Sequence, residues 1–211
     1  MLRSRDGRAL LVTQAAHALA QGMLTVIIPW LILEQGGSAA QAAIGFAITF
    51  VPFLLLAAPA GLAGDRWPRR PLLGAAPGTG TMLAVLLAIL LGTTGLALPW
   101  LYAAAFLIGS VRVFVDAAMF GALATVASRD EMMPAQAALA QAFNLGYFGG
   151  PAIAGLALVL GHGFAGALVA GALAVAGVAA VTGSRRLDER DEAGPRPPIR
   201  RGLAFLFLSR H

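Results

Sequence analysis

Long apolar runs separated by short polar connectors dominate the pattern along the chain. A helix needs about 20 residues to cross about 30 Å of hydrocarbon, and six segments reach that length. The predicted spans cover 9–33, 41–63, 72–94, 98–127, 135–160 and 164–183. Their richness in Ala, Leu and Gly, with no apolar/polar alternation of period two, favours helices over a membrane barrel. The pattern therefore predicts an all-α membrane protein, a bundle of six transmembrane helices.

Composition strengthens this interpretation. Of the 211 residues, 58% are hydrophobic and 12% are charged, too few polar groups to cover a soluble domain of this size. The chain has no cysteine, and its three histidines lie far apart, at 17, 162 and 211, so no disulfide or metal site is predicted. No phosphate-binding loop or nucleophile–base arrangement is present either, so we expect neither an enzyme nor a bound cofactor.

The arginines predict the orientation of the chain. Fourteen of the 15 lie in residues 1–8, 64–71, 128–134 and 184–211, and the alternate connectors carry none. The positive-inside rule then places both termini in the cytoplasm, in a multi-pass protein of the plasma (inner) membrane. Trp30 and Trp100 fall at predicted outer interfaces, where indole rings are favoured. This distribution favours a lipid partner over nucleic acid, despite a net charge of +5.

The region after the last span changes character. Residues 184–201 are charged and proline-rich, which predicts a cytoplasmic linker. Residues 202–211 are apolar again but too short to span a membrane.

Two charged residues lie inside a predicted span. Arg112 and Asp116 are four apart, so they share one helix face and are able to pair. Ionisable groups are costly in hydrocarbon and normally face a cavity or a partner. One interpretation is a self-neutralising structural pair. The other is that both line a substrate cavity, where Asp116 exchanges a proton and Arg112 tunes that exchange or meets an anionic substrate group.

The first span carries a polar stripe on an otherwise apolar helix. Its members, spaced three, four and four apart, are Gln14, His17, Gln21 and Thr25. Such spacing puts them on one face, which favours the lining of a wet cavity. His17 either titrates there or serves only as a hydrogen-bond donor. In the fifth span, Gln141 and Asn144 are three apart and are predicted to face the same cavity.

The connector GLAGDRWPRR resembles the loop between helices 2 and 3 of major facilitator superfamily transporters, whose pattern is G-x-L-a-D-r-x-G-r-r. The matching positions are Gly61, Asp65, Arg66, Arg69 and Arg70, while Pro68 replaces the second glycine. The resemblance implies a gating loop that bonds to neighbouring helices in one state of the transporter and releases in the other. From charge alone, the arginines need only set topology.

Two further segments carry the same resemblance. GYFGGPAIAGL is similar to the family's fifth-helix motif, G-x-x-x-G-P-x-x-G-G, with matches at Gly146, Gly150, Pro151 and Gly155. The glycines allow close helix approach and the proline permits a kink, so packing and gating are both open. Arg112 is similar to the family's helix-4 arginine. Residues 129–151 resemble the branch that contains macrolide and siderophore exporters.

The resemblance covers essentially the whole chain as the N-terminal half of a twelve-helix transporter, with 199–208 similar to the lead into helix 7. It implies proton-coupled efflux of drugs or small amphiphilic metabolites by alternating access, with the proton gradient as energy source. We therefore expect a partial chain whose partners are lipid, a small-molecule substrate, and either the missing C-terminal half or a homodimer mate. The alternatives are an importer of the same superfamily and a six-helix scaffold or half-transporter.

Overall fold

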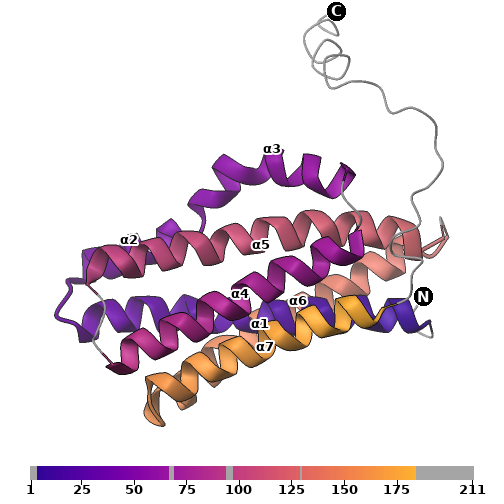
Figure 1. Ribbon diagram of the computed structural model, residues 1–211. Coiled ribbons are helices and arrows are strands. Elements are labelled where there is room, and N and C mark those ends of the chain that lie inside the picture. Colours follow the sequence, from indigo (N-terminus) through magenta and orange to yellow (C-terminus); the bar gives the residue numbers. More distant parts are fainter. Residues whose placement is uncertain (1–3, 67–68, 94–96, 129, 184–211) are drawn as a thin grey trace, which may run out of the picture.

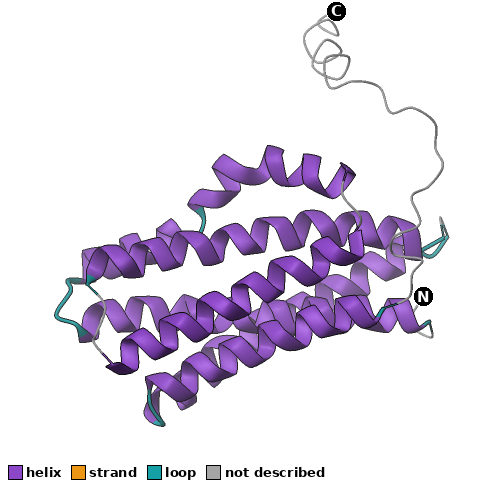
Figure 2. Ribbon diagram, viewed as in Figure 1, coloured by secondary structure: helices purple, strands orange, loops and turns teal. Residues whose placement is uncertain are grey.

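The computed structural model describes residues 4–66, 69–93, 97–128 and 130–183. This part of the chain is helical and contains no strand (Figure 2). Its helices are α1 (Arg5–Glu34), α2 (Ala39–Ile48), α3 (Val51–Arg66), α4 (Arg69–Thr93), α5 (Leu98–Val126), α6 (Met132–Val159) and α7 (His162–Thr182). The predicted linker 184–201 and the segment 202–211 lie outside the described residues.

Local sequence signals explain several helix ends. Ser4 caps α1 by accepting a hydrogen bond from the backbone N–H of Gly7 at 3.0 Å. Ser38 and Gln41 form a reciprocal capping box at the start of α2. Between these helices, Gly36 adopts a φ of +82°, which favours glycine because it has no Cβ.

Five stretches in the described part are long and apolar enough to cross a membrane. They are Arg5–Glu34, Ala39–Ala63, Leu98–Ala124, Met132–Val159 and His162–Thr182. These stretches overlap five of the six predicted spans, and α4 occupies the remaining one with 25 residues. The all-α membrane bundle predicted from the hydrophobic pattern is therefore confirmed, while the crossing of the membrane by six spans stays a prediction.

The second predicted span, 41–63, is not one continuous helix. The structure divides it into α2 and α3, and the backbone N–H groups of Thr49 and Phe50 bond three residues back instead of four. Pro52 supplies the physical reason, because it has no N–H to donate to the carbonyl of Ile48 and its ring crowds that carbonyl. Proline is tolerated in the first turn of α3, where an N–H has no intrahelical partner.

With α2 and α3 counted as one span, the helices fall into two sets of three spans: α1, α2–α3 and α4, and α5, α6 and α7. α1 packs on α6 and α7, α5 packs on α3 and α4, and α4 packs on α7 (Figure 1). The two sets pack in corresponding ways. The pair α1–α6 corresponds to α5–α3, the pair α1–α7 corresponds to α5–α4, and α4–α7 corresponds to itself. This packing pattern is that of two internal repeats of three spans each.

Two apolar clusters fill the bundle. One surrounds the C-terminal half of α1, including Met23, Ile28 and Leu31, and the other surrounds Leu10 and Leu73. On α1, the buried polar residues Thr13, His17 and Gln21 fall mainly between them. The hydroxyl of Thr13 donates to the carbonyl of Ala176 on α7 at 3.2 Å, so one of these polar groups joins two helices.

Candidate functional site

A cavity of about 260 Å³ opens between α1, α5 and α6. Its polar lining consists of Gln14, Arg112, Asp116, Gln136 and Asn144. Its apolar lining consists of Met119, Phe120, Leu123, Leu139, Ala140 and Phe143. The structure therefore brings four of the predicted cavity residues together: Gln14, Arg112, Asp116 and Asn144.

The two charged residues are adjacent but loosely paired. Nε of Arg112 lies 3.6 Å from Oδ2 of Asp116, a distance too long for a hydrogen bond. The Arg112 side chain is 17% exposed and that of Asp116 is 24% exposed. Nε of Arg112 is buried and has no hydrogen-bond partner among the described residues. The pair attracts electrostatically, and the Nε donor of Arg112 stays without a hydrogen-bond partner in the described structure.

Aromatic rings surround the guanidinium of Arg112. Its Cζ lies 5.1 Å from the ring centroid of Phe53, 5.6 Å from Tyr147, 5.8 Å from Phe143 and 5.9 Å from Phe50. All four distances are within the range of a cation–π interaction. The rings of Phe143 and Tyr147 stack on each other, with centroids 5.3 Å apart. We call Phe50, Phe53, Phe143 and Tyr147 the aromatic box.

The polar stripe of α1 divides into different environments. His17 is 1% exposed and Gln21 is 6% exposed, and neither lines the cavity. Both ring nitrogens of His17, Nε2 of Gln21 and Oε1 of Gln14 are buried without a hydrogen-bond partner in the described part of the chain. Thr25 donates to the carbonyl of Gly22, within its own helix, at 2.6 Å.

The predicted fifth-helix motif lies in α6 and faces α1 at two of its positions. A Cβ on Gly146 would meet the carbonyl oxygen of Ala15, and one on Gly150 would lie 2.6 Å from the backbone nitrogen of Met23. In contrast, a Cβ on Gly155 would meet nothing within 4 Å. Pro151 lies inside a helix that continues on both sides of it. The two inward glycines let α1 and α6 approach closely, as small residues do between membrane helices.

Other predicted site residues lie elsewhere. Gln141 is exposed and does not line the cavity. Gly61 is exposed on α3, and a Cβ there would meet nothing within 4 Å. The backbones of Asp65 and Arg66 end α3, and those of Arg69 and Arg70 begin α4, but their side chains lie outside the described part. Trp67 and Pro68 are also outside it, so the gating loop stays a prediction.

Sequence reasoning missed Gln136, the apolar lining and the aromatic box. The sequence did contain a pattern that predicts the α6 wall of the cavity. The spacing of a single helical face joins positions 136, 139, 140, 143 and 144. No comparable spacing pointed to Phe50 and Phe53, since they lie across the break between α2 and α3. Within the described residues, no group of three His, Cys, Asp or Glu side chains is placed to hold a metal ion.

Comparison with known proteins agrees with this architecture. Residues 10–210 match the sequence profile of the Major Facilitator Superfamily. The Multidrug efflux pump Tap of Mycobacterium bovis (strain BCG / Pasteur 1173P2) is 33% identical over 171 residues, covering 74% of this chain and 39% of the relative. The pump of the same name from Mycobacterium tuberculosis (strain ATCC 25618 / H37Rv) gives the same values. The chain thus spans about two-fifths of the length of these relatives.

No solved structure matches the chain. The family profile, in contrast, extends over nearly all of the sequence, including every described helix in part or in full. The chain therefore belongs to the major facilitator superfamily.

Proposed function

We propose that the chain forms the first half of a secondary transporter that exports drugs or small amphiphilic metabolites in exchange for protons. The observation that carries this proposal is the cavity between α1, α5 and α6, which places a carboxylate and a guanidinium beside an apolar wall. Charged groups inside membrane spans are costly and usually serve a substrate or ion pathway. The family and the multidrug efflux relatives support a transporter over an enzyme.

The proposed roles follow from the chemistry of the lining. Asp116 is the carboxylate that exchanges a proton, because it is the acidic side chain that lines the cavity. Arg112 acts on that exchange through its charge, 3.6 Å away. Gln14, Gln136 and Asn144 offer neutral polar contacts to a substrate.

Alternating access is the proposed working cycle, with this bundle and a second six-helix unit rocking about a shared substrate site. The close packing of α1 on α6 at Gly146 and Gly150 supports movement of the bundle as one body. In this proposal both termini are cytoplasmic, in the plasma (inner) membrane, and the connector 61–70 is a gating loop on the same side.

The test reconstitutes the full-length protein in liposomes with an imposed pH gradient and a panel of fluorescent aromatic amphiphiles of cationic, anionic and zwitterionic charge. We expect the substrate to move in the direction opposite to the protons. A pH-sensitive dye inside the liposomes measures the proton movement. Asp116→Asn should reduce substrate-dependent proton movement to background, because an amide does not exchange a proton at these pH values.

Asp130→Asn is the matched control, since it neutralises an exposed carboxylate in the connector before α6. It should leave coupling unchanged. Flux in the same direction as the protons would show an importer, and unchanged coupling in Asp116→Asn would exclude the assigned role. A protein that moves no member of the panel under any gradient would contradict the proposal.

A further inference from the structure

Arg112 and Asp116 line one cavity, and no hydrogen bond joins Nε of Arg112 to Oδ2 of Asp116. Charge-assisted hydrogen bonds between such groups are normally 2.7–2.9 Å long, and the distance between Nε and Oδ2 is 3.6 Å. Nε of Arg112 has no hydrogen-bond partner among the described residues. The cavity therefore presents a cation and an anion side by side, at a distance too long for a hydrogen bond between Nε and Oδ2.

The aromatic box explains why the guanidinium does not depend on Asp116 alone. Phe50 and Phe53 approach it from the α2–α3 junction, and Phe143 and Tyr147 approach it from α6. Ring faces attract the cation but accept none of its directional hydrogen bonds in the way that an oxygen does. The box thus helps to hold Arg112 in place and occupies none of its hydrogen-bond donors.

The rest of the lining suits an uncharged aromatic body. Phe143 belongs both to the box and to the cavity wall, and Phe120 and Leu139 add apolar surface. Gln14 and Asn144 border the same space, and Oε1 of Gln14 is buried without a partner in the described structure. The volume of about 260 Å³ accommodates an aromatic ring with a compact polar head.

We propose that this cavity selects zwitterionic aromatic compounds, with an anionic group on Arg112, a cationic amine on Asp116 and the ring against Phe143. A zwitterion pairs both partly buried charges and leaves the net charge of the cavity unchanged. A cation or an anion of the same skeleton pairs with one charge and removes water from the other without giving it a hydrogen-bond partner, which is costly. This inference rests on the proposed function, since it takes the cavity to be the substrate site.

The test compares three ligands of one skeleton on the purified full-length protein: phenylalanine, its methyl ester and N-acetylphenylalanine. The ester keeps only the cation and the acetyl derivative keeps only the anion. Competition against radiolabelled phenylalanine in equilibrium dialysis should show that the zwitterion binds at least about tenfold more tightly than either derivative. Equal affinities, or a preference for either single ion, would overturn the proposal.

Two variants test the assignment of each charge. Arg112→Gln should make the ester the strongest competitor, and Asp116→Asn should make N-acetylphenylalanine the strongest. Arg8→Gln and Asp130→Asn remove exposed charges that do not line the cavity, and both should keep the wild-type order. The comparison of ligands on the wild-type protein decides the matter even if a cavity variant does not fold.

Measuring both ligand binding and transport tests the ligand class and the transporter function separately. Preferential binding of the zwitterion without any gradient-driven flux would contradict the transporter proposal and leave the ligand class standing. Flux that shows no preference for zwitterions would support the transporter and overturn the ligand class.

Discussion

At residue 150, glycine is required by the backbone of α1 rather than by any turn. A Cβ there would lie 2.6 Å from the nitrogen of Met23 and 2.7 Å from the carbonyl carbon of Gly22. These are backbone atoms, so relief requires that α1 and α6 move apart. Gly155, five residues later in the same helix, has open space where its Cβ would be.

We therefore expect opposite effects from the same substitution at the two positions. Gly150→Ala should destabilise the protein by about 1–3 kcal/mol, because it overpacks a helix contact. Gly155→Ala should be neutral or stabilising by up to about 1 kcal/mol, because alanine favours the helix. Thermal unfolding of both variants in detergent measures the difference. Equal melting temperatures would show that the close approach of α1 and α6 is not needed for stability.

Spacing within one helix predicted some of the cavity residues, but not all that it pointed to line the cavity, and it gave no sign of residues that meet across helices. Arg112 and Asp116 lie four apart on α5, and the structure places both in the cavity. The spacing of three predicted that Gln141 and Asn144 face the same cavity. At 100° per residue, however, the two positions are 60° apart around the helix axis, and only Asn144 lines the cavity. The aromatic box combines α6 with the α2–α3 junction, and no spacing in one chain segment encodes such a contact.

At the scale of elements, the break between α2 and α3 is the main departure from the predicted spans. The pattern of apolar residues runs through the break, so hydropathy gives no sign of it. Pro52 marks it, yet Pro29, Pro59, Pro77 and Pro151 lie inside continuous helices. At this break, close packing accompanies the missing N–H, since a Cβ on Gly109 of α5 would meet the carbonyl of Thr49.

Pro52→Ala should join α2 and α3 into one helix, because the new N–H is able to donate to the carbonyl of Ile48. Hydrogen exchange at residues 49–53 should slow by about tenfold or more, as expected for amides that enter a continuous helix. Pro59→Ala, at an exposed position inside α3, is the control and should leave exchange at 49–53 unchanged. Unchanged exchange in Pro52→Ala would show that packing against Gly109 alone maintains the break.

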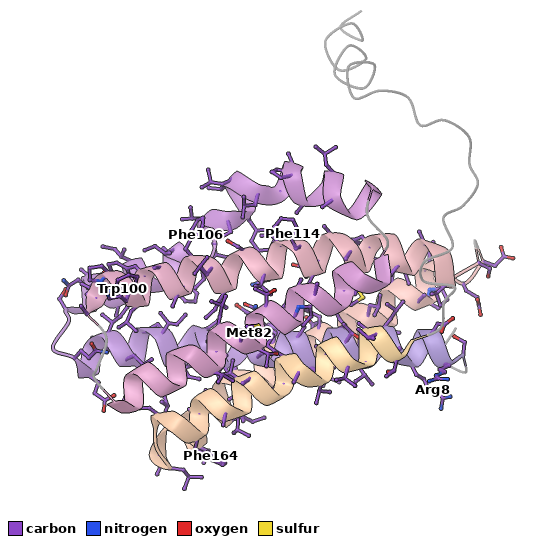
Figure 3. All side chains as sticks on the ribbon, viewed as in Figure 1. Arg8, Met82, Trp100, Phe106, Phe114 and Phe164 are labelled. Carbon is purple, nitrogen blue, oxygen red and sulfur yellow. The ribbon has the colours of Figure 1, made fainter. Side chains whose placement is uncertain are left out.

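At the scale of the whole molecule, Arg8 and Trp100 mark opposite ends of the bundle. Arg8 lies at one end and Trp100 at the other, at the start of α5 (Figure 3). Both Trp100 and Trp30 are at least half exposed, as expected for indoles at a membrane interface. The connector after α1, which contains Gln35, lies at the same end of the bundle as the start of α5 (Figure 1). The connector before α6, which contains Asp130, lies at the opposite end, near the start of α1.

The proposed orientation makes a direct prediction for these two connectors. Because the chain has no cysteine, a single introduced cysteine reports its own position within it. A membrane-impermeant maleimide added to intact cells should label Gln35→Cys at once and Asp130→Cys only after permeabilisation, since the arginine-rich connectors remain inside. Both side chains are exposed, so burial does not account for a difference in labelling. The reverse order would invert the bundle, and the connector 61–70 would then face the outside, which would exclude its role as a cytoplasmic gating loop.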